Sequence, residues 1–265
     1  MTFVSLDGRR VHVMRLGGGE GAGVPVVMAH GLFTGSVASW FFTAAPLLAK
    51  DRPVVLYDLR GHGRSDPPYD GDHSSTSQAV DLARLVDHLE LARFHLVGHS
   101  FGALVAIRHA VDHGEHLASL TLVEPPIRGD GEADGEADGE AWWWRTAGEE
   151  TARLAPEVRR RPAAMGPPVE EIRRSLTSEP EVTDDDLRRF PHATTVVLGD
   201  RSAAIAMVPR LRRVCPTIGV RVFAGGHSIH VDARDDVVNH LETVFRGAPP
   251  SPQPVGAENE EVAYG

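Results

Sequence analysis

Short apolar stretches alternate with longer amphipathic stretches along most of the chain. The apolar stretches predict strands at Val11–Leu16, Val24–Ala29, Pro53–Tyr57, Phe94–Val97, Leu117–Val123, Thr194–Leu198 and Val220–Phe223. The amphipathic stretches predict helices at Trp40–Lys50, Gln78–Leu91, Ala103–Val111 and Asp235–Arg246. Strands and helices that alternate in this way form βαβ units. The pattern therefore predicts an α/β fold with a mostly parallel central sheet and helices on both faces.

The alternation stops after Glu124-Pro125-Pro126 and returns at Thr194. Between them, residues 127–190 contain no convincing strand and several prolines. We therefore expect a core made of residues 1–126 and 191–246, with residues 127–190 inserted between two strands. Residues 247–265 are rich in Pro, Gly and Glu and are expected to form a disordered tail.

The net charge of −10 is concentrated in two short segments of the chain of 265 residues. Residues 130–140 hold six acidic residues and no basic one, and the tail adds three more glutamates. The remaining acidic and basic residues nearly balance, so the charge predicts neither nucleic-acid binding nor strong steering of a charged substrate. Asp-Gly-Glu-Ala occurs three times in tandem from Asp130 to Ala141. A calcium loop is disfavoured there because Ala141 stands where such a loop needs a bidentate glutamate.

Cysteine and lysine are almost absent, which excludes several kinds of chemistry. Cys215 is the only cysteine, so neither an internal disulfide nor an all-cysteine zinc site can form. Lys50 is the only lysine, which leaves little room for Schiff-base chemistry. No apolar stretch approaches the roughly 20 residues of a membrane span. The first ten residues lack a secretory signal pattern, so we expect a cytoplasmic protein.

One motif points to nucleophilic catalysis. Gly98-His99-Ser100-Phe101-Gly102 matches G-x-S-x-G, follows a predicted strand and begins a predicted helix. A tight strand-to-helix turn of this kind forces its central residue into a strained conformation and exposes the serine hydroxyl above the sheet edge. The glycines on either side leave room for the turn.

This motif and three other segments resemble the α/β-hydrolase fold superfamily. The other segments are His30-Gly31, the stretch Asp58-Leu59-Arg60-Gly61-His62-Gly63-Arg64-Ser65, and Gly226-His227. The resemblance covers most of the chain between about residues 10 and 246, and it implies that the insertion at 127–190 is a helical cap or lid. It implies a catalytic triad in the chain order serine, acid, histidine, with Ser100 as nucleophile. It also implies an oxyanion hole made by the backbone N–H groups of Leu32 and Phe101.

Two residues compete for the role of the catalytic base. The resemblance places the base between the last strand and the last helix, where His227 stands. His230 lies three residues further on and is the reserve candidate.

The identity of the acid is open between two residues. Most relatives have an aspartate three residues after the glycine that ends the strand following the cap, but this position holds Ser202. Asp200 is close to it in sequence. Glu124, which ends the strand after the nucleophile's helix, is the favoured candidate because some branches of the superfamily place the acid there.

A serine nucleophile with a histidine base suits acyl transfer. We expect a serine hydrolase that cleaves a carboxylic ester or lactone, with no cofactor and no metal. Phe33 and the cap residues Trp142, Trp143 and Trp144 are candidate substrate-binding residues for a bulky, apolar or polyketide-like group, with packing of the cap onto the core as the other role of the tryptophans. The expected partner is a small molecule rather than nucleic acid, and a homodimer remains open. Two alternatives stay open as well: a non-hydrolytic enzyme of the same fold (eliminase, cyclase or cofactor-free haloperoxidase-like), and a non-catalytic small-molecule receptor.

Overall fold

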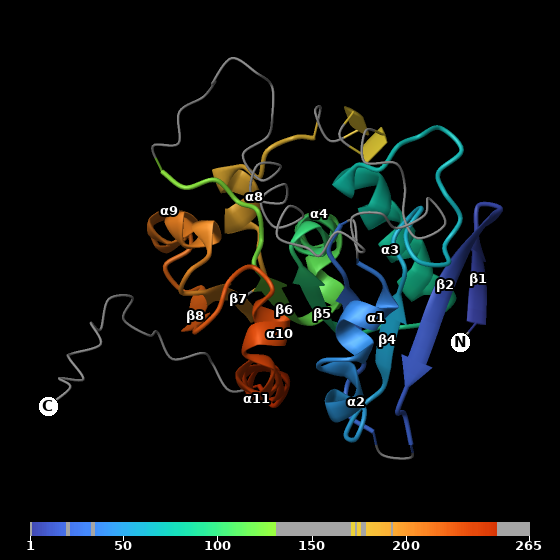
Figure 1. The fold of residues 1–265 in the computed structure, drawn as a ribbon, viewed down its shortest axis with the longest axis horizontal. Coiled ribbons are helices and arrows are strands. Elements are labelled where there is room, and N and C mark those ends of the chain that lie inside the picture. Colours follow the sequence, from blue (N-terminus) through green and yellow to red (C-terminus); the bar gives the residue numbers. More distant parts are fainter. Residues whose placement is uncertain are drawn as a thin grey trace, which may run out of the picture.

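The described part of the computed structural model is built on one eight-stranded sheet in the order β1-β2-β4-β3-β5-β6-β7-β8 (Figure 1). The description covers residues 2–19, 22–32, 35–130, 171–172, 174–175, 179–191 and 193–247. The strands are β1 (Thr2–Leu6), β2 (Arg9–Leu16), β3 (Val26–Ala29), β4 (Val54–Tyr57), β5 (Phe94–His99), β6 (Leu117–Val123), β7 (Thr194–Gly199) and β8 (Gly219–Phe223). All pairs from β4 to β8 are parallel, whereas β1–β2 and β2–β4 are antiparallel. This confirms the predicted mostly parallel α/β sheet.

Strand β1 was not among the predicted strands. It pairs with β2 through a two-residue turn at Asp7 and Gly8, which have φ angles of 47° and 80°. Two consecutive residues with positive φ match the twist of a tight hairpin. The alternating exposed and buried residues of β1 fit an edge strand with one solvated face.

Helices cover both faces of the sheet. One core layer contains α3 (Ser75–His88), α4 (Phe101–His113) and α9 (Val208–Val214), and the other contains α1 (Val37–Phe41), α2 (Ala45–Leu48) and α11 (Arg234–Phe245). Alternate residues of the central strands supply the two layers, so Leu96 belongs to the first and Val97 to the second. Three short helical segments, η1 (Gly114–His116), η3 (Ala203–Met207) and α10 (Ile229–Asp232), lie in the connections.

The single helix predicted at Trp40–Lys50 is in fact two short helices, α1 and α2. Pro46 lies in the first turn of α2. Proline is tolerated at that point because the first N–H groups of a helix have no acceptor within it, but it disrupts a helix that would continue through it. The chain therefore begins a new helix instead of extending α1.

The inserted cap at 127–190 remains a prediction, because most of it lies outside the described residues. The described part includes α8 (Asp184–Arg188) and short pieces that contact the start of α3. Ser75 N–H donates to Glu179 Oε2 at 2.8 Å, and His73 Nε2 lies 3.3 Å from Glu171 Oε1. The Asp-Gly-Glu-Ala repeat beyond Asp130 and the tail from residue 248 also fall outside the described residues. No helix in the described ranges is both long and apolar enough to cross a membrane.

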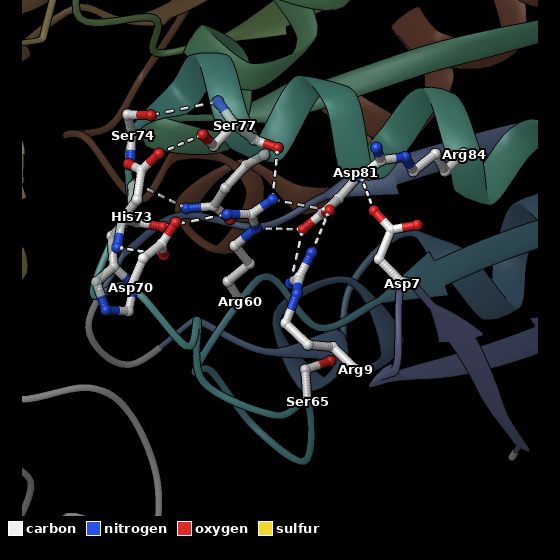
Figure 2. Close-up of polar contacts among 12 residues, drawn as sticks. Asp7, Arg9, Arg60, Ser65, Asp70, His73, Ser74, Ser77, Asp81 and Arg84 are labelled. Atoms are coloured by element: carbon white, nitrogen blue, oxygen red, sulfur yellow. Dashed lines mark hydrogen bonds and ion pairs between the residues drawn. The ribbon is translucent and has the colours of Figure 1, made fainter.

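A buried ion cluster joins β2, the loop after β4 and helix α3 (Figure 2). Arg9 donates to the two carboxylate oxygens of Asp81 at 3.0 and 2.5 Å. Arg60 binds the same carboxylate through Nε and through Nη2, the latter at 2.9 Å. Burial would raise the pKa of the Asp81 carboxyl, but the hydrogen bonds from Arg60 and Arg9 outweigh it and hold that pKa below its usual value. Asp81 is therefore an ionised link between three segments of the core.

Replacing Asp81 by Asn should lower the free energy of unfolding by on the order of 3 kcal/mol, because two guanidinium groups would lose their buried counter-charge. Urea denaturation at pH 7 measures the change. An ionised group whose pKa is lowered by folding stabilises the fold above its unfolded pKa, so the difference from wild type should shrink as the pH falls below about 4. Asp66→Asn is the matched control, since its pair with Arg10 is solvent-exposed and should contribute little. Equal effects of the two substitutions would contradict this role of Asp81.

Candidate active site

Ser100 stands between the last residue of β5 and the first residue of α4. Its φ and ψ angles are 53° and −120°, a strained conformation for a residue with a side chain, as the motif predicts. The turn is tight: a β-carbon added at Gly98 would lie 2.3 Å from the carbonyl oxygen of Gly102, and one added at Gly102 would lie 2.5 Å from that of His30. Only glycine fits at these two positions, as a nucleophile elbow between a strand and a helix requires.

His227 faces Ser100 from the loop that follows β8. Its Nε2 lies 2.8 Å from Ser100 Oγ, the distance of a hydrogen bond. The backbone of this loop is fixed by His99, whose Nε2 lies 2.9 Å from the carbonyl oxygen of His227 and can only donate to it. His99, which precedes Ser100, therefore holds the main chain of His227 in place.

Glu124 lies on the other side of the His227 ring. It follows the last residue of β6, has a φ of 52° and is completely buried. Its Oε2 is 3.2 Å from His227 Nδ1, and its Oε1 accepts the N–H of Gly199 at 2.5 Å. The hydroxyl of Ser202 donates to Oε2 as well. The structure thus aligns a buried carboxylate, an imidazole and a serine hydroxyl.

The two reserve candidates have other contacts. Asp200 Oδ1 accepts the N–H of Gly225 at 2.9 Å and lies beside Arg201, with half of its side chain exposed. His230 is buried against His99, with ring centroids 4.2 Å apart, and burial together with His227 lowers its pKa to about 4. Asp200 therefore supports the loop that carries His227, and His230 packs behind that loop.

The predicted oxyanion donors, Leu32 and Phe101, belong to segments next to Ser100 in sequence or in space. Phe101 is the first residue of α4, so its N–H has no acceptor inside the helix. Leu32 follows Gly31, where an added β-carbon would lie 3.3 Å from Cβ of Ser100. Gly31, the residue before Leu32, therefore packs against Ser100. Phe33, Trp142, Trp143 and Trp144, the predicted substrate-binding residues, lie outside the described residues.

His30 fixes the segment that carries Leu32. Its Nδ1 lies 2.7 Å from the carbonyl oxygen of Gly31, and its Nε2 accepts the N–H of Leu59 at 3.0 Å. One nitrogen must donate and the other accept, so the ring is neutral, in agreement with a pKa that burial lowers. His30 has a structural role here. Across the described ranges, no three His, Cys, Asp or Glu side chains are arranged to hold a metal ion.

Comparisons with known proteins agree with this architecture. The family model described as alpha/beta hydrolase fold matches residues 24–164, more than half of the chain. The chain belongs to the α/β-hydrolase fold family. The solved structure of Est816, an N-acyl homoserine lactone degrading enzyme, has a TM-score of 0.72 and 24% sequence identity, and the match covers 91% of this chain and 99% of that one.

Two curated relatives, both from Pseudomonas putida, match one part of the chain more closely. The dihydrolipoyllysine-residue acetyltransferase component of an acetoin cleaving system is 44% identical over 117 residues, which are 44% of this chain and 30% of the relative. N-formylmaleamate deformylase is 37% identical over 128 residues, which are 48% of this chain and 46% of the relative. The chain therefore matches less than half of the length of either relative.

Glu124→Gln should lower kcat by about 10⁴-fold, because a neutral amide cannot stabilise a charged imidazole and favours the wrong tautomer of its ring. Asp200→Asn should lower kcat by less than tenfold, since the asparagine oxygen can still accept the N–H of Gly225. Steady-state hydrolysis of a chromogenic ester by both variants measures the effect. A larger loss in Asp200→Asn than in Glu124→Gln would show that Glu124 is not the acid.

Proposed function

We propose that the protein is a serine hydrolase that cleaves a carboxylic ester or lactone through an acyl-enzyme on Ser100. The observation that carries the proposal is the continuous contact from Ser100 Oγ to His227 Nε2 at 2.8 Å and from His227 Nδ1 to Glu124 Oε2 at 3.2 Å. A serine hydroxyl is a weak nucleophile until an adjacent base removes its proton. His227 is in position to do so, and Glu124 is in position to orient the ring.

In the first half of the proposed reaction, His227 Nε2 takes the proton of Ser100 as the serine oxygen attacks the acyl carbonyl carbon. The negative charge then moves onto the carbonyl oxygen, which the N–H groups of Leu32 and Phe101 stabilise. One such donor is typically worth about 3 kcal/mol to the transition state. The protonated His227 next gives its proton to the leaving alkoxide, and the acyl group stays on Ser100.

In the second half, water replaces the leaving group. His227 Nε2 takes a proton from the water, the oxygen attacks the acyl-enzyme carbonyl, and the proton returns to Ser100 as the carboxylic acid is released. With a lactone, the leaving alkoxide remains part of the same molecule, so the product is a hydroxy acid.

The histidines around His227 favour this proton cycle. Burial, followed by the neighbouring His230 and His227, lowers the pKa of His99 well below its usual value, and burial lowers that of His230 to about 4. Both rings are therefore neutral at pH 7. Neither His99 nor His230 therefore opposes the positive charge that His227 gains during the reaction.

The choice of an ester or lactone is supported by chemistry and by similarity. An activated serine with two oxyanion donors suits any acyl group with a good leaving group. One structural neighbour is named as an N-acyl homoserine lactone degrading enzyme and one curated relative as a deformylase, and both names are compatible with a hydrolase that acts on acyl compounds.

A non-hydrolytic reaction is the second candidate. One curated relative, matched over 44% of this chain, is named as an acetyltransferase component rather than as a hydrolase. An enzyme of this kind would keep an activated Ser100 but would not turn over simple esters.

A panel of chromogenic esters and lactones separates these functions. Wild type should hydrolyse at least one ester or lactone, and Ser100→Ala or His227→Ala should reduce kcat by on the order of 10⁶. A fluorophosphonate should add one phosphonyl group to wild type and none to Ser100→Ala, as intact-protein mass spectrometry would show.

Two other results would contradict the proposal. Phosphonylation of Ser100 without turnover of any ester or lactone would favour the non-hydrolytic enzyme. Failure of Ser100 to react, together with tight binding of a small molecule, would favour a receptor.

A further inference from the structure

We propose that Ser202 is a positioning residue that fixes the carboxylate of Glu124 for His227. The inference rests on the proposed function, because it assigns a role in the triad that this function requires. Ser202 occupies the position at which most relatives have the catalytic aspartate. In the structure its hydroxyl donates to Glu124, the residue that follows β6.

The Ser202 hydroxyl contacts the carboxylate oxygen of Glu124 that faces His227. Glu124 Oε2 is both the atom that faces His227 Nδ1 and the acceptor of the Ser202 hydroxyl. The N–H of Gly199 holds the other oxygen, Oε1, at 2.5 Å. With one oxygen held by Gly199 at the end of β7 and the other by Ser202 at the start of η3, the carboxylate plane can turn only if one of these hydrogen bonds breaks.

Ser202 is itself held so that its proton points at Glu124. Its backbone N–H donates to Gly199 O at 3.2 Å, and its Oγ accepts the N–H of Ala204 at 3.2 Å. Since Oγ is already an acceptor from Ala204, its own hydrogen is free to point toward the carboxylate. The residue is 6% exposed, so little water competes for the hydroxyl.

A completely buried carboxylate needs such donors. Removing a charged group from water is costly unless hydrogen bonds replace the lost hydration. The Nδ1–H group of His227 is one such donor, but it belongs to the ring that gains and loses a proton during the reaction. The donors from Gly199 and Ser202 do not take part in proton transfer, so they can hold the carboxylate in one place throughout.

The alternative is that Ser202 only caps η3, in which case its loss would weaken the fold and leave the triad unchanged. A double-mutant cycle with Glu124→Gln separates the two roles. The rate of Ser100 phosphonylation by a fluorophosphonate is the readout, split into its maximal rate and its half-saturating concentration. This readout needs no knowledge of the natural substrate.

Ser202→Ala should lower the maximal rate of phosphonylation by about 10- to 100-fold and leave the half-saturating concentration within twofold, because a misplaced catalytic group costs rate rather than binding. Ser202→Thr retains the hydroxyl and should restore most of the rate. In the Glu124→Gln background, Ser202→Ala should change the rate by less than twofold. Ser119→Ala is the matched control: it removes another buried hydroxyl, bonded to His95 at 2.7 Å, at the opposite end of the strands, and should leave the rate unchanged.

Three results would overturn the proposal: no loss of rate in Ser202→Ala, an equal loss in the wild-type and Glu124→Gln backgrounds, or an equal loss in Ser119→Ala. Failure of the proposed function gives a different result. If wild type is phosphonylated but hydrolyses no ester or lactone, the hydrolase assignment fails while the cycle still tests Ser202. A wild-type protein that resists the phosphonate would overturn both.

Discussion

The buried carboxylate of Glu124 is the interaction on which the rest of the site depends. It has no exposed surface, so hydrogen-bond donors of the protein must replace the water that its oxygens lack. These come from three separate segments: the end of β7 at Gly199, the start of η3 at Ser202, and the loop after β8 at His227. The position of the histidine therefore depends on the correct pairing of β6 with β7 and of β7 with β8, which couples the folding of the sheet to the assembly of the site.

The parallel sheet makes this convergence possible. Ser100 N–H donates to Val123 O, and Glu124 N–H donates to Val197 O. The backbone of both residues is therefore still hydrogen-bonded to the neighbouring strand. Each has a φ slightly above 50°, which is rare for residues with a side chain. Such strain persists only where the surroundings fix the backbone. Here the close approach of glycines fixes Ser100, and the hydrogen-bonded carboxylate holds Glu124.

Most of this architecture follows from sequence patterns. Seven strands and the strand-turn-helix around Ser100 could be predicted because apolar runs and the two glycines are local signals. The edge strand β1 was missed because its alternation is short, and one predicted helix proved to be two. The choice between Glu124 and Asp200 could not be settled from sequence, since both carboxylates lie at the ends of neighbouring strands and only the side-chain direction separates them. The serine at position 202 showed from the sequence that the usual aspartate is missing. The sequence did not show that the Ser202 hydroxyl contacts Glu124.

The central claim is that Glu124 holds the Nδ1 proton of His227. Proton NMR of the protein with Ser100 phosphonylated tests it most directly, because a proton shared between an imidazolium and a buried carboxylate gives a strongly downfield resonance. This resonance should be present in wild type, survive Asp200→Asn and be lost in Glu124→Gln. A resonance that survives Glu124→Gln and disappears in Asp200→Asn would contradict the central claim.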